Sequence, residues 1–117
     1  MNITHPELVK ALAKPGQAIV DSLTAKDAHL LHMTVGVSGE AGELLDAVKK
    51  AVIYRKEIDV ENVKEELGDL LFYMQGICQE FDFTLEDCKA ANIAKLSKRY
   101  ESLNYSDKAA QERNDKK

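Results

Sequence analysis

Two long stretches of apolar residues at helical spacing constrain the fold of this chain more than any other feature. In the first stretch apolar residues recur every three or four positions from Leu30 to Val52, and in the second from Val63 to Phe81. This spacing is typical of a helix that buries one face. No segment has the two-residue alternation of a strand. The sequence therefore predicts an all-α fold.

N-cap signals mark where these helices begin. Thr24 is followed three positions later by Asp27, and Thr84 by Asp87, a pattern in which the two residues cap the first helical turn. Asp59 is a third N-cap candidate, after a turn at the preceding residues. These signals predict helices over about 25–54, 60–80 and 85–101.

The rest of the chain is organised around these helices as a single domain of 117 residues. Both prolines, Pro6 and Pro15, lie near the N-terminus, and Pro15 followed by Gly16 is expected to break an N-terminal arm into two short helices. We divide the domain into the arm, the core helices and a polar C-terminal tail, over residues 1–23, 24–101 and 102–117.

Composition excludes several classes of protein. A net charge of −4 argues against a nucleic-acid-binding protein, which needs a basic face. No apolar run approaches the ~20 residues of a membrane-spanning helix, and the N-terminus lacks the layout of a signal peptide. The two cysteines, Cys78 and Cys88, fall in helical patterns, where we expect buried free thiols. Together these features favour a soluble, cytoplasmic protein.

Two acidic pairs with the same spacing stand in the long helices. Glu40 and Glu43 lie in the first, and Glu66 and Asp69 in the second. Residues three apart lie on the same side of a helix, so each pair can present two carboxylates to one cation. Carboxylates gathered between two helices repel one another unless a cation lies between them. By spacing alone, a divalent-metal site and an acidic surface are equally good interpretations.

Sequence counting leaves the register of the two helices open. Glu43 lies farther from the turn along its helix than Glu66 does along its own. At a rise of 1.5 Å per residue the difference is ~9 Å, so an ideal hairpin would not place the two acidic pairs side by side. Glycines interrupt the first helix at Gly36, Gly39 and Gly42. Because glycine weakens a helix, this series favours close approach of another backbone or a ligand over a local kink.

The acidic residues also carry a family resemblance. The runs GEAGELL at 39–45 and EELGDLL at 65–71 resemble the signature of MazG-type nucleotide pyrophosphohydrolases, an all-α family of nucleoside triphosphate pyrophosphatases. All four acidic positions of the E-x-x-E and E-x-x-D pattern match. The resemblance extends roughly over residues 29–100, with further matching runs at 31–32, 46–50 and 92–100, and a weaker one at 14–16.

This resemblance implies a reaction and a site. MazG-type enzymes cleave a nucleoside triphosphate between its α and β phosphates by water attack, releasing a monophosphate and pyrophosphate. By resemblance, Glu40, Glu43, Glu66 and Asp69 are the catalytic residues and hold Mg²⁺, or Mn²⁺ in its place. The sequence does not determine which carboxylate takes the proton of the attacking water, and one of the first pair is our candidate. Mg²⁺ prefers oxygen ligands and is commonly held by carboxylates together with substrate phosphates.

Residues outside the acidic pairs are candidates for substrate binding. Asn92, Lys95 and Arg99 are spaced so that they lie along one side of a helix. One interpretation is that they bind phosphate or sugar oxygens of the substrate. The alternative is a solvated face with cations near the C-terminal end of the helix. Tyr73 lies on the same flank as the second acidic pair. It is interpreted either as a contact to the sugar or base of the substrate, or as a half-buried core residue. His32 is a substrate contact or a packed residue.

The resemblance finally implies an assembly. It predicts a MazG-like bundle of four to five helices that forms a homodimer, or a dimer of dimers, with a site completed by the neighbouring subunit. Two alternatives to the pyrophosphohydrolase stay open: a catalytically silent helical interaction module, and a relative that acts on phosphoribosyl-ATP or another modified nucleotide. Base preference depends on pocket shape, on which the sequence is silent.

Overall fold

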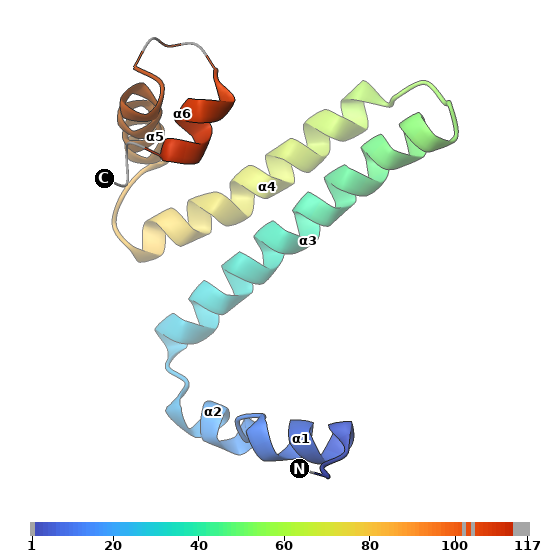
Figure 1. The fold of residues 1–117 in the computed structure, drawn as a ribbon, viewed down its shortest axis with the longest axis vertical. Coiled ribbons are helices and arrows are strands. Elements are labelled where there is room, and N and C mark those ends of the chain that lie inside the picture. Colours follow the sequence, from blue (N-terminus) through green and yellow to red (C-terminus); the bar gives the residue numbers. More distant parts are fainter. Residues whose placement is uncertain (1, 102, 104, 114–117) are drawn as a thin grey trace.

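All regular secondary structure in the computed structural model, which describes residues 2–101, 103 and 105–113, is helical. The all-α fold class is therefore confirmed. No helix among these residues is long and apolar enough to cross a membrane. In chain order (Figure 1) the helices are α1 (His5–Leu12), α2 (Gly16–Ser22), α3 (Ala25–Ile53), α4 (Val60–Glu80), α5 (Leu85–Arg99) and α6 (Asp107–Glu112).

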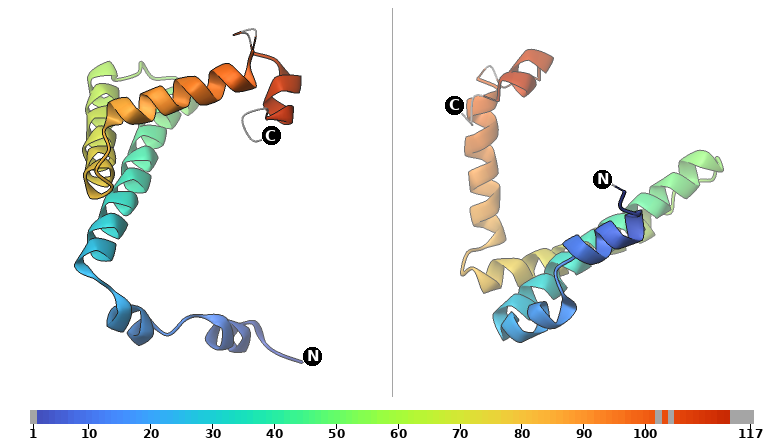
Figure 2. Two further views of the ribbon diagram at one scale, coloured as in Figure 1. Left: turned by 90° about the vertical axis from the view of Figure 1, so that its left-hand side faces the viewer. Right: turned by 60° about the horizontal axis from the view of Figure 1, so that its bottom comes forward.

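An antiparallel hairpin of α3 and α4 forms the centre of the molecule (Figure 1). The two helices pack along their length and are joined by a loop at residues 54–59, in which Arg55 has a left-handed backbone with φ of 53°. The arm of α1 and α2 leaves the other end of the hairpin, as does α5. Figure 2 shows that α5 runs across the direction of α4 rather than alongside it.

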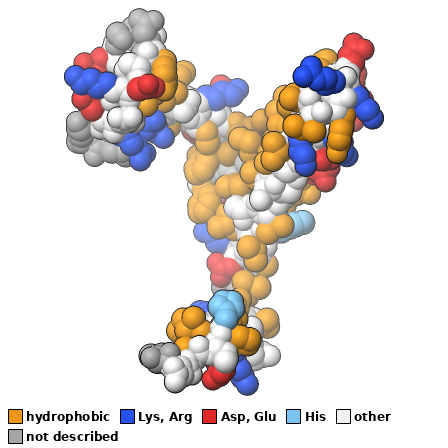
Figure 3. Space-filling view, turned by 45° about the vertical axis from the view of Figure 1, so that its right-hand side comes forward, with side chains coloured by type: hydrophobic (Ala, Val, Ile, Leu, Met, Phe, Trp, Pro, Cys, Tyr) orange, Lys and Arg blue, Asp and Glu red, His pale blue; other side chains and the backbone are white. Residues whose placement is uncertain are grey.

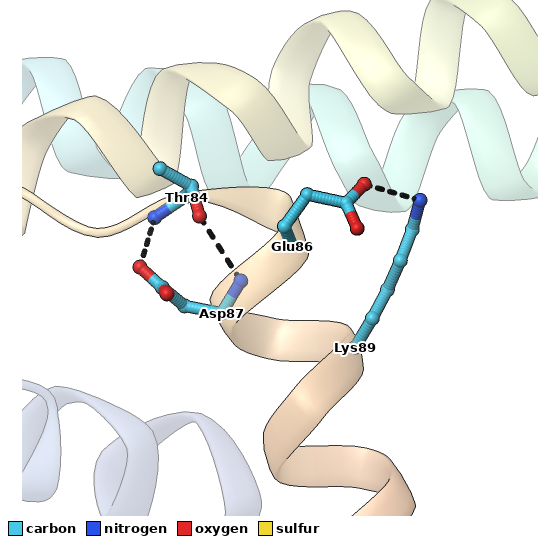
Figure 4. A network of polar contacts seen from close by, with 4 residues as sticks. All are labelled: Thr84, Glu86, Asp87 and Lys89. Atoms are coloured by element: carbon cyan, nitrogen blue, oxygen red, sulfur yellow. Dashed lines mark hydrogen bonds and ion pairs between the residues drawn. The ribbon is translucent and has the colours of Figure 1, made fainter.

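The predicted N-caps fix the helix starts. Thr24 Oγ1 accepts the backbone N–H of Asp27 at 3.0 Å, and the Asp27 carboxylate accepts the N–H of Thr24 at 3.2 Å. Thr84 and Asp87 make the same two bonds at 3.0 and 2.9 Å (Figure 4). The carboxylate of Asp59 accepts an N–H of the first turn of α4 at 3.0 Å. The three long helices therefore begin where the sequence predicted.

Close packing between α3 and α4 depends on a glycine in each helix. A Cβ on Gly36 would overlap the ring of Tyr73, and a Cβ on Gly76 would overlap the side chain of Met33. A close neighbour is therefore present at Gly36 of the glycine series, but it is a side chain rather than the backbone or ligand that the sequence predicted. Two glycines of the series have no such neighbour in the described chain: Gly39 and Gly42.

Two details differ from the sequence expectations. The segment expected to be only a polar tail contains α6, because Ser106 acts as an N-cap and accepts the N–H of Ala109 at 3.0 Å. Residues 114–117 of that tail lie outside the described residues. Cys78 and Cys88 are both free thiols, as expected, but only Cys78 is buried, whereas Cys88 is exposed.

A single chain encloses very little core. Among the described residues Met33 and Cys78 are the only buried hydrophobic side chains. The chain exposes 9562 Å², whereas a compact monomer of its 13.0 kDa mass exposes about 6,300 Å². Its radius of gyration is 20.3 Å, against about 13 Å for a compact domain of this length. The apolar faces of the helices are therefore largely uncovered by their own chain.

Candidate metal centre

Three of the four predicted acidic residues meet where α3 and α4 face each other. Glu40 comes from α3, and Glu66 and Asp69 come from α4. One carboxylate oxygen from each residue lies within 4.8 Å of the other two. Glu40 and Glu66 are half-buried, and Asp69 is exposed. The hairpin thus gathers carboxylates that are far apart in the sequence into a group of the size that one cation can bridge.

The contacts of Gly36 with Tyr73 and of Met33 with Gly76 set the register of the two helices. Counting from the turn placed Glu43 and Glu66 at different heights along the hairpin, whereas this register sets Glu43 opposite Glu66 and Glu40 opposite Asp69. In the structure it is Glu40 that reaches Glu66 and Asp69, while Glu43 is exposed and lies outside this three-residue group. Its charge nevertheless acts on Glu66. All four acids therefore share one electrostatic environment, although only three form the close cluster.

Glu66 occupies the least favourable position in the cluster. Hydrogen-bonding contact with the Glu40 carboxyl is the largest cause that raises the pKa of Glu66, followed by burial and by the charges of Glu40, Asp69 and Glu43. Glu66 Oε2 is also buried without a hydrogen-bond partner among the described residues. A carboxylate that is crowded by like charges and unsatisfied is stabilised by a bound cation. Because all the donors are oxygens, the residues fit Mg²⁺ or Mn²⁺.

A hollow of about 300 Å³ opens beside the acidic cluster, lined by Glu40, Asp69, Phe72 and Tyr73. The half-buried ring of Tyr73 lies over Gly36. It meets the ring of His32 edge-on, with ring centroids 6.2 Å apart, and that of Phe72, with centroids 5.1 Å apart. Carboxylates and aromatic rings therefore border one hollow, which suits a ligand with both a charged and a planar part.

Sequence reasoning missed Phe72. Its side chain is 68% exposed although it is large and apolar, and it lies three residues after Asp69 on the same helix. Helical spacing measured from the acidic pair would have placed it beside the site. Tyr73 was predicted because it lies four residues after Asp69, on the same flank of the helix as Glu66 and Asp69.

The candidate residues on α5 lie away from this hollow within one chain. Asn92 contributes to a different, mainly apolar hollow of about 370 Å³ between α5 and the residues that follow it. Lys95 is exposed and Arg99 is half-buried. The structure thus brings Tyr73 next to the acidic cluster, with His32 against the Tyr73 ring, while the α5 residues form a separate group.

Comparison with known proteins places the chain in a family. Residues 28–103 match the family described as MazG nucleotide pyrophosphohydrolase domain. The chain belongs to the MazG family. It is similar to the Gene 37 protein of Mycobacterium phage L5, with 32% identity over 91 residues that cover 73% of this chain and 75% of that protein. That name states no activity. No solved structure gives a significant match.

The MazG match covers the parts of the chain that carry the candidate site. It begins inside α3, includes α4 and α5, and ends before α6. The acidic cluster and the aromatic side of the hollow therefore both belong to the MazG region. The arm of α1 and α2 lies outside it.

Proposed function

We propose that this protein is a metal-dependent nucleoside triphosphate pyrophosphohydrolase. It cleaves a ribo- or deoxyribonucleoside triphosphate to the monophosphate and pyrophosphate, by water attack at the linkage between the α and β phosphates. The observation that carries the proposal is the meeting of Glu40, Glu66 and Asp69 within 4.8 Å, inside the region that matches the MazG family.

The carboxylates of this cluster would hold Mg²⁺, or Mn²⁺ in its place. Glu40, Glu66 and Asp69 offer ligand oxygens, and the unpartnered Oε2 of Glu66 is satisfied when a cation binds. A bound metal neutralises triphosphate charge and lowers the pKa of an attacking water. Glu43 stands close enough to affect the pKa of Glu66 but outside the cluster. We therefore assign it as the fourth acidic residue and the candidate general base.

The neighbouring side chains would orient the nucleotide. The ring of Tyr73 is held in place by packing on Gly36 and by its contact with His32, so it presents a fixed surface in the hollow to the sugar or base. Phosphoryl transfer depends mainly on such positioning and on charge stabilisation. The α5 residues reach a site only if α5 of one copy meets the hairpin of another. In that arrangement the proposed phosphate and sugar contacts are Asn92, Lys95 and Arg99.

The activity is tested with full-length protein, Mg²⁺ and a panel of nucleotides. Pyrophosphate, and not orthophosphate, should appear. Glu66→Gln and Asp69→Asn should each lower turnover at least about 100-fold, since each loses several kcal/mol of charge stabilisation. Glu61→Gln makes a matched change of charge at an exposed position outside the cluster on the same helix, and should leave turnover unchanged.

Each other outcome identifies a different error. Full activity in both cluster variants would show that the site lies elsewhere. No pyrophosphate from any nucleotide, with no stabilisation by Mg²⁺, would favour the silent interaction module. Release from phosphoribosyl-ATP or another modified nucleotide alone would favour the specialised relative.

We also propose that the working unit is a homodimer or a homotetramer. Each chain exposes 9562 Å², whereas a compact monomer of its mass exposes about 6,300 Å², a difference of about 3,000 Å². Permanent dimers bury from 2,000 to more than 5,000 Å² in total over both partners. Two copies together exceed the compact value by about 6,000 Å², so an extensive dimer interface, or the additional interfaces of a tetramer, would supply burial of this amount.

The uncovered face of α4 has the pattern of a helix-packing surface. Val60, Leu67, Met74 and Phe81 recur every seven residues and are between 38 and 67% exposed. A seven-residue apolar repeat is typical of helices that pack side by side. Figure 3 shows hydrophobic side chains exposed over much of one face of the hairpin. Two hairpins that pack through this repeat form a four-helix bundle.

Sedimentation at micromolar concentration tests the assembly and should give a dimer or a larger species. Leu67→Glu places a charge in the repeat and should shift the protein towards the monomer. Gln79→Glu adds the same charge at an exposed position on another face of α4, and should leave the assembly intact. A wild-type monomer at this concentration would contradict the proposal.

A further inference from the structure

The N-terminal arm is the largest part of the chain that the proposed activity does not use. It lies outside the MazG match, and it makes no extensive contact with the other helices that the structure describes. All described residues from Asn2 to Ser22 are exposed. Figures 1 and 2 show the arm standing away from the hairpin. Its helices therefore have no extensive packing partner among the residues that the structure describes.

Helices this short need such a partner. α1 has eight residues and α2 has seven, whereas isolated helices shorter than about 12–15 residues are marginal in water. The sequence nonetheless specifies α1 with a Thr4 N-cap, which accepts the N–H of Glu7 at 3.3 Å, and with Pro6 in the first turn. Packing against a second chain would supply the stabilisation that these short helices lack.

The arm carries apolar side chains that such packing would cover. Leu8 and Leu12 are four residues apart in α1, and Ile19 and Leu23 are four apart at α2 and its end. Each pair therefore lies on one helix face. These four side chains are between 39 and 75% exposed. Apolar clusters of this kind on a soluble chain mark an interaction surface.

The connection to α3 directs the arm away from its own hairpin. Only Leu23 and Thr24 separate α2 from α3, and both have extended backbones, with ψ of 122° and 165°. The capping box between Thr24 and Asp27 holds this conformation. The direction in which the arm leaves is therefore set by local hydrogen bonds.

We propose that the arm packs on a second copy of this chain, so that two copies exchange their arms. The inference rests on the dimer proposed above and on the area that each chain leaves exposed. The partner offers uncovered apolar surface of its own. One part of that surface is a hollow of about 450 Å³ between the start of α3 and the end of α4, where Leu30, Leu31, Ile77 and Phe81 contribute.

A photo-crosslinking amino acid at position 12 of the full-length protein tests the exchange. Leu12 is 75% exposed in one chain and lies on the apolar face of α1. Illumination should give a covalent dimer on a denaturing gel. The same probe at Lys10, on the other side of α1, should give far less.

Crosslinks within one chain, or none, would overturn the exchange even if sedimentation shows a dimer. A monomer in sedimentation would overturn both the exchange and the dimer. Pyrophosphate release measures the enzymatic proposal independently of either.

A substitution gives a second measurement. Leu12→Ala removes most of the apolar side chain without disfavouring the helix. Each lost leucine contact weakens binding about tenfold or more, and a symmetric dimer contains two of them, so the dissociation constant should rise about 100-fold. Lys10→Ala is the matched control and should change it less than about threefold. Equal effects of the two substitutions would count against the exchanged arm.

Discussion

Replacing Gly36 by alanine tests whether the close packing of α3 on α4 has been correctly described. An alanine Cβ would overlap three carbons of the Tyr73 ring. The ring also contacts His32 and Phe72, with centroids 6.2 and 5.1 Å away, so moving it aside would disturb both contacts. Gly42 lies on the same helix, and a Cβ there meets nothing within 4 Å. It is therefore the matched control.

Two opposing effects determine the size of the change. Alanine is more favourable than glycine in a helix by about 1 kcal/mol. An additional carbon forced into a packed contact costs about 1–3 kcal/mol. Gly42→Ala gains only the first term, so its free energy of unfolding should rise by about 1 kcal/mol. Gly36→Ala carries both terms and should lie about 1–3 kcal/mol below Gly42→Ala.

Urea unfolding of the full-length protein, followed by circular dichroism at one fixed protein concentration, measures this difference. The concentration must be fixed because assembly contributes to stability. Gly36→Ala should also raise the KM for nucleotide, since Tyr73 lines the hollow beside the acids. If Gly36→Ala stabilises the protein as much as Gly42→Ala does, the two helices do not approach each other at this point.

Three further results are expected. Because the folded-state pKa of Glu66 is raised, the metal-free protein should become more stable as the pH falls from neutral towards that pKa, and Mg²⁺ affinity should fall over the same range. Urea unfolding at several pH values measures the stability, and calorimetry measures the Mg²⁺ affinity. Glu66→Gln should reduce the pH dependence of both quantities. If the variant keeps the pH dependence of the wild type, Glu66 is not its source. Thr84→Ala removes one bond of the capping box in Figure 4 and should cost about 1 kcal/mol in urea unfolding, whereas Thr84→Ser should cost less. The melting temperature should rise with protein concentration, because assembly stabilises the folded chain; a constant value would argue for a stable monomer.

Features that depend on neighbouring residues were determined by the sequence alone. The capping residues Thr24, Asp59 and Thr84 placed the helix starts, because a cap bonds only to amides two or three positions away. The break at Pro15 follows from the missing N–H and fixed φ of proline. The placement of Glu66 and Asp69 on one flank follows from helical geometry. For the same reason Phe72 was within reach of sequence reasoning.

The contacts between helices were decided only by the tertiary structure. The level at which α3 meets α4 depends on the 54–59 loop and on how Tyr73 fits over Gly36, neither of which residue counting describes. In this register Glu40 lies opposite Asp69 and Glu43 opposite Glu66, and Glu40 is the acidic residue of α3 that joins the close cluster on α4. The sequence likewise predicted which helix faces are apolar, but not which of these faces remain exposed to solvent in a single chain. Burial depends on contacts among residues distant in the chain, and in this protein the larger part of those faces lies outside the contacts that a single copy makes.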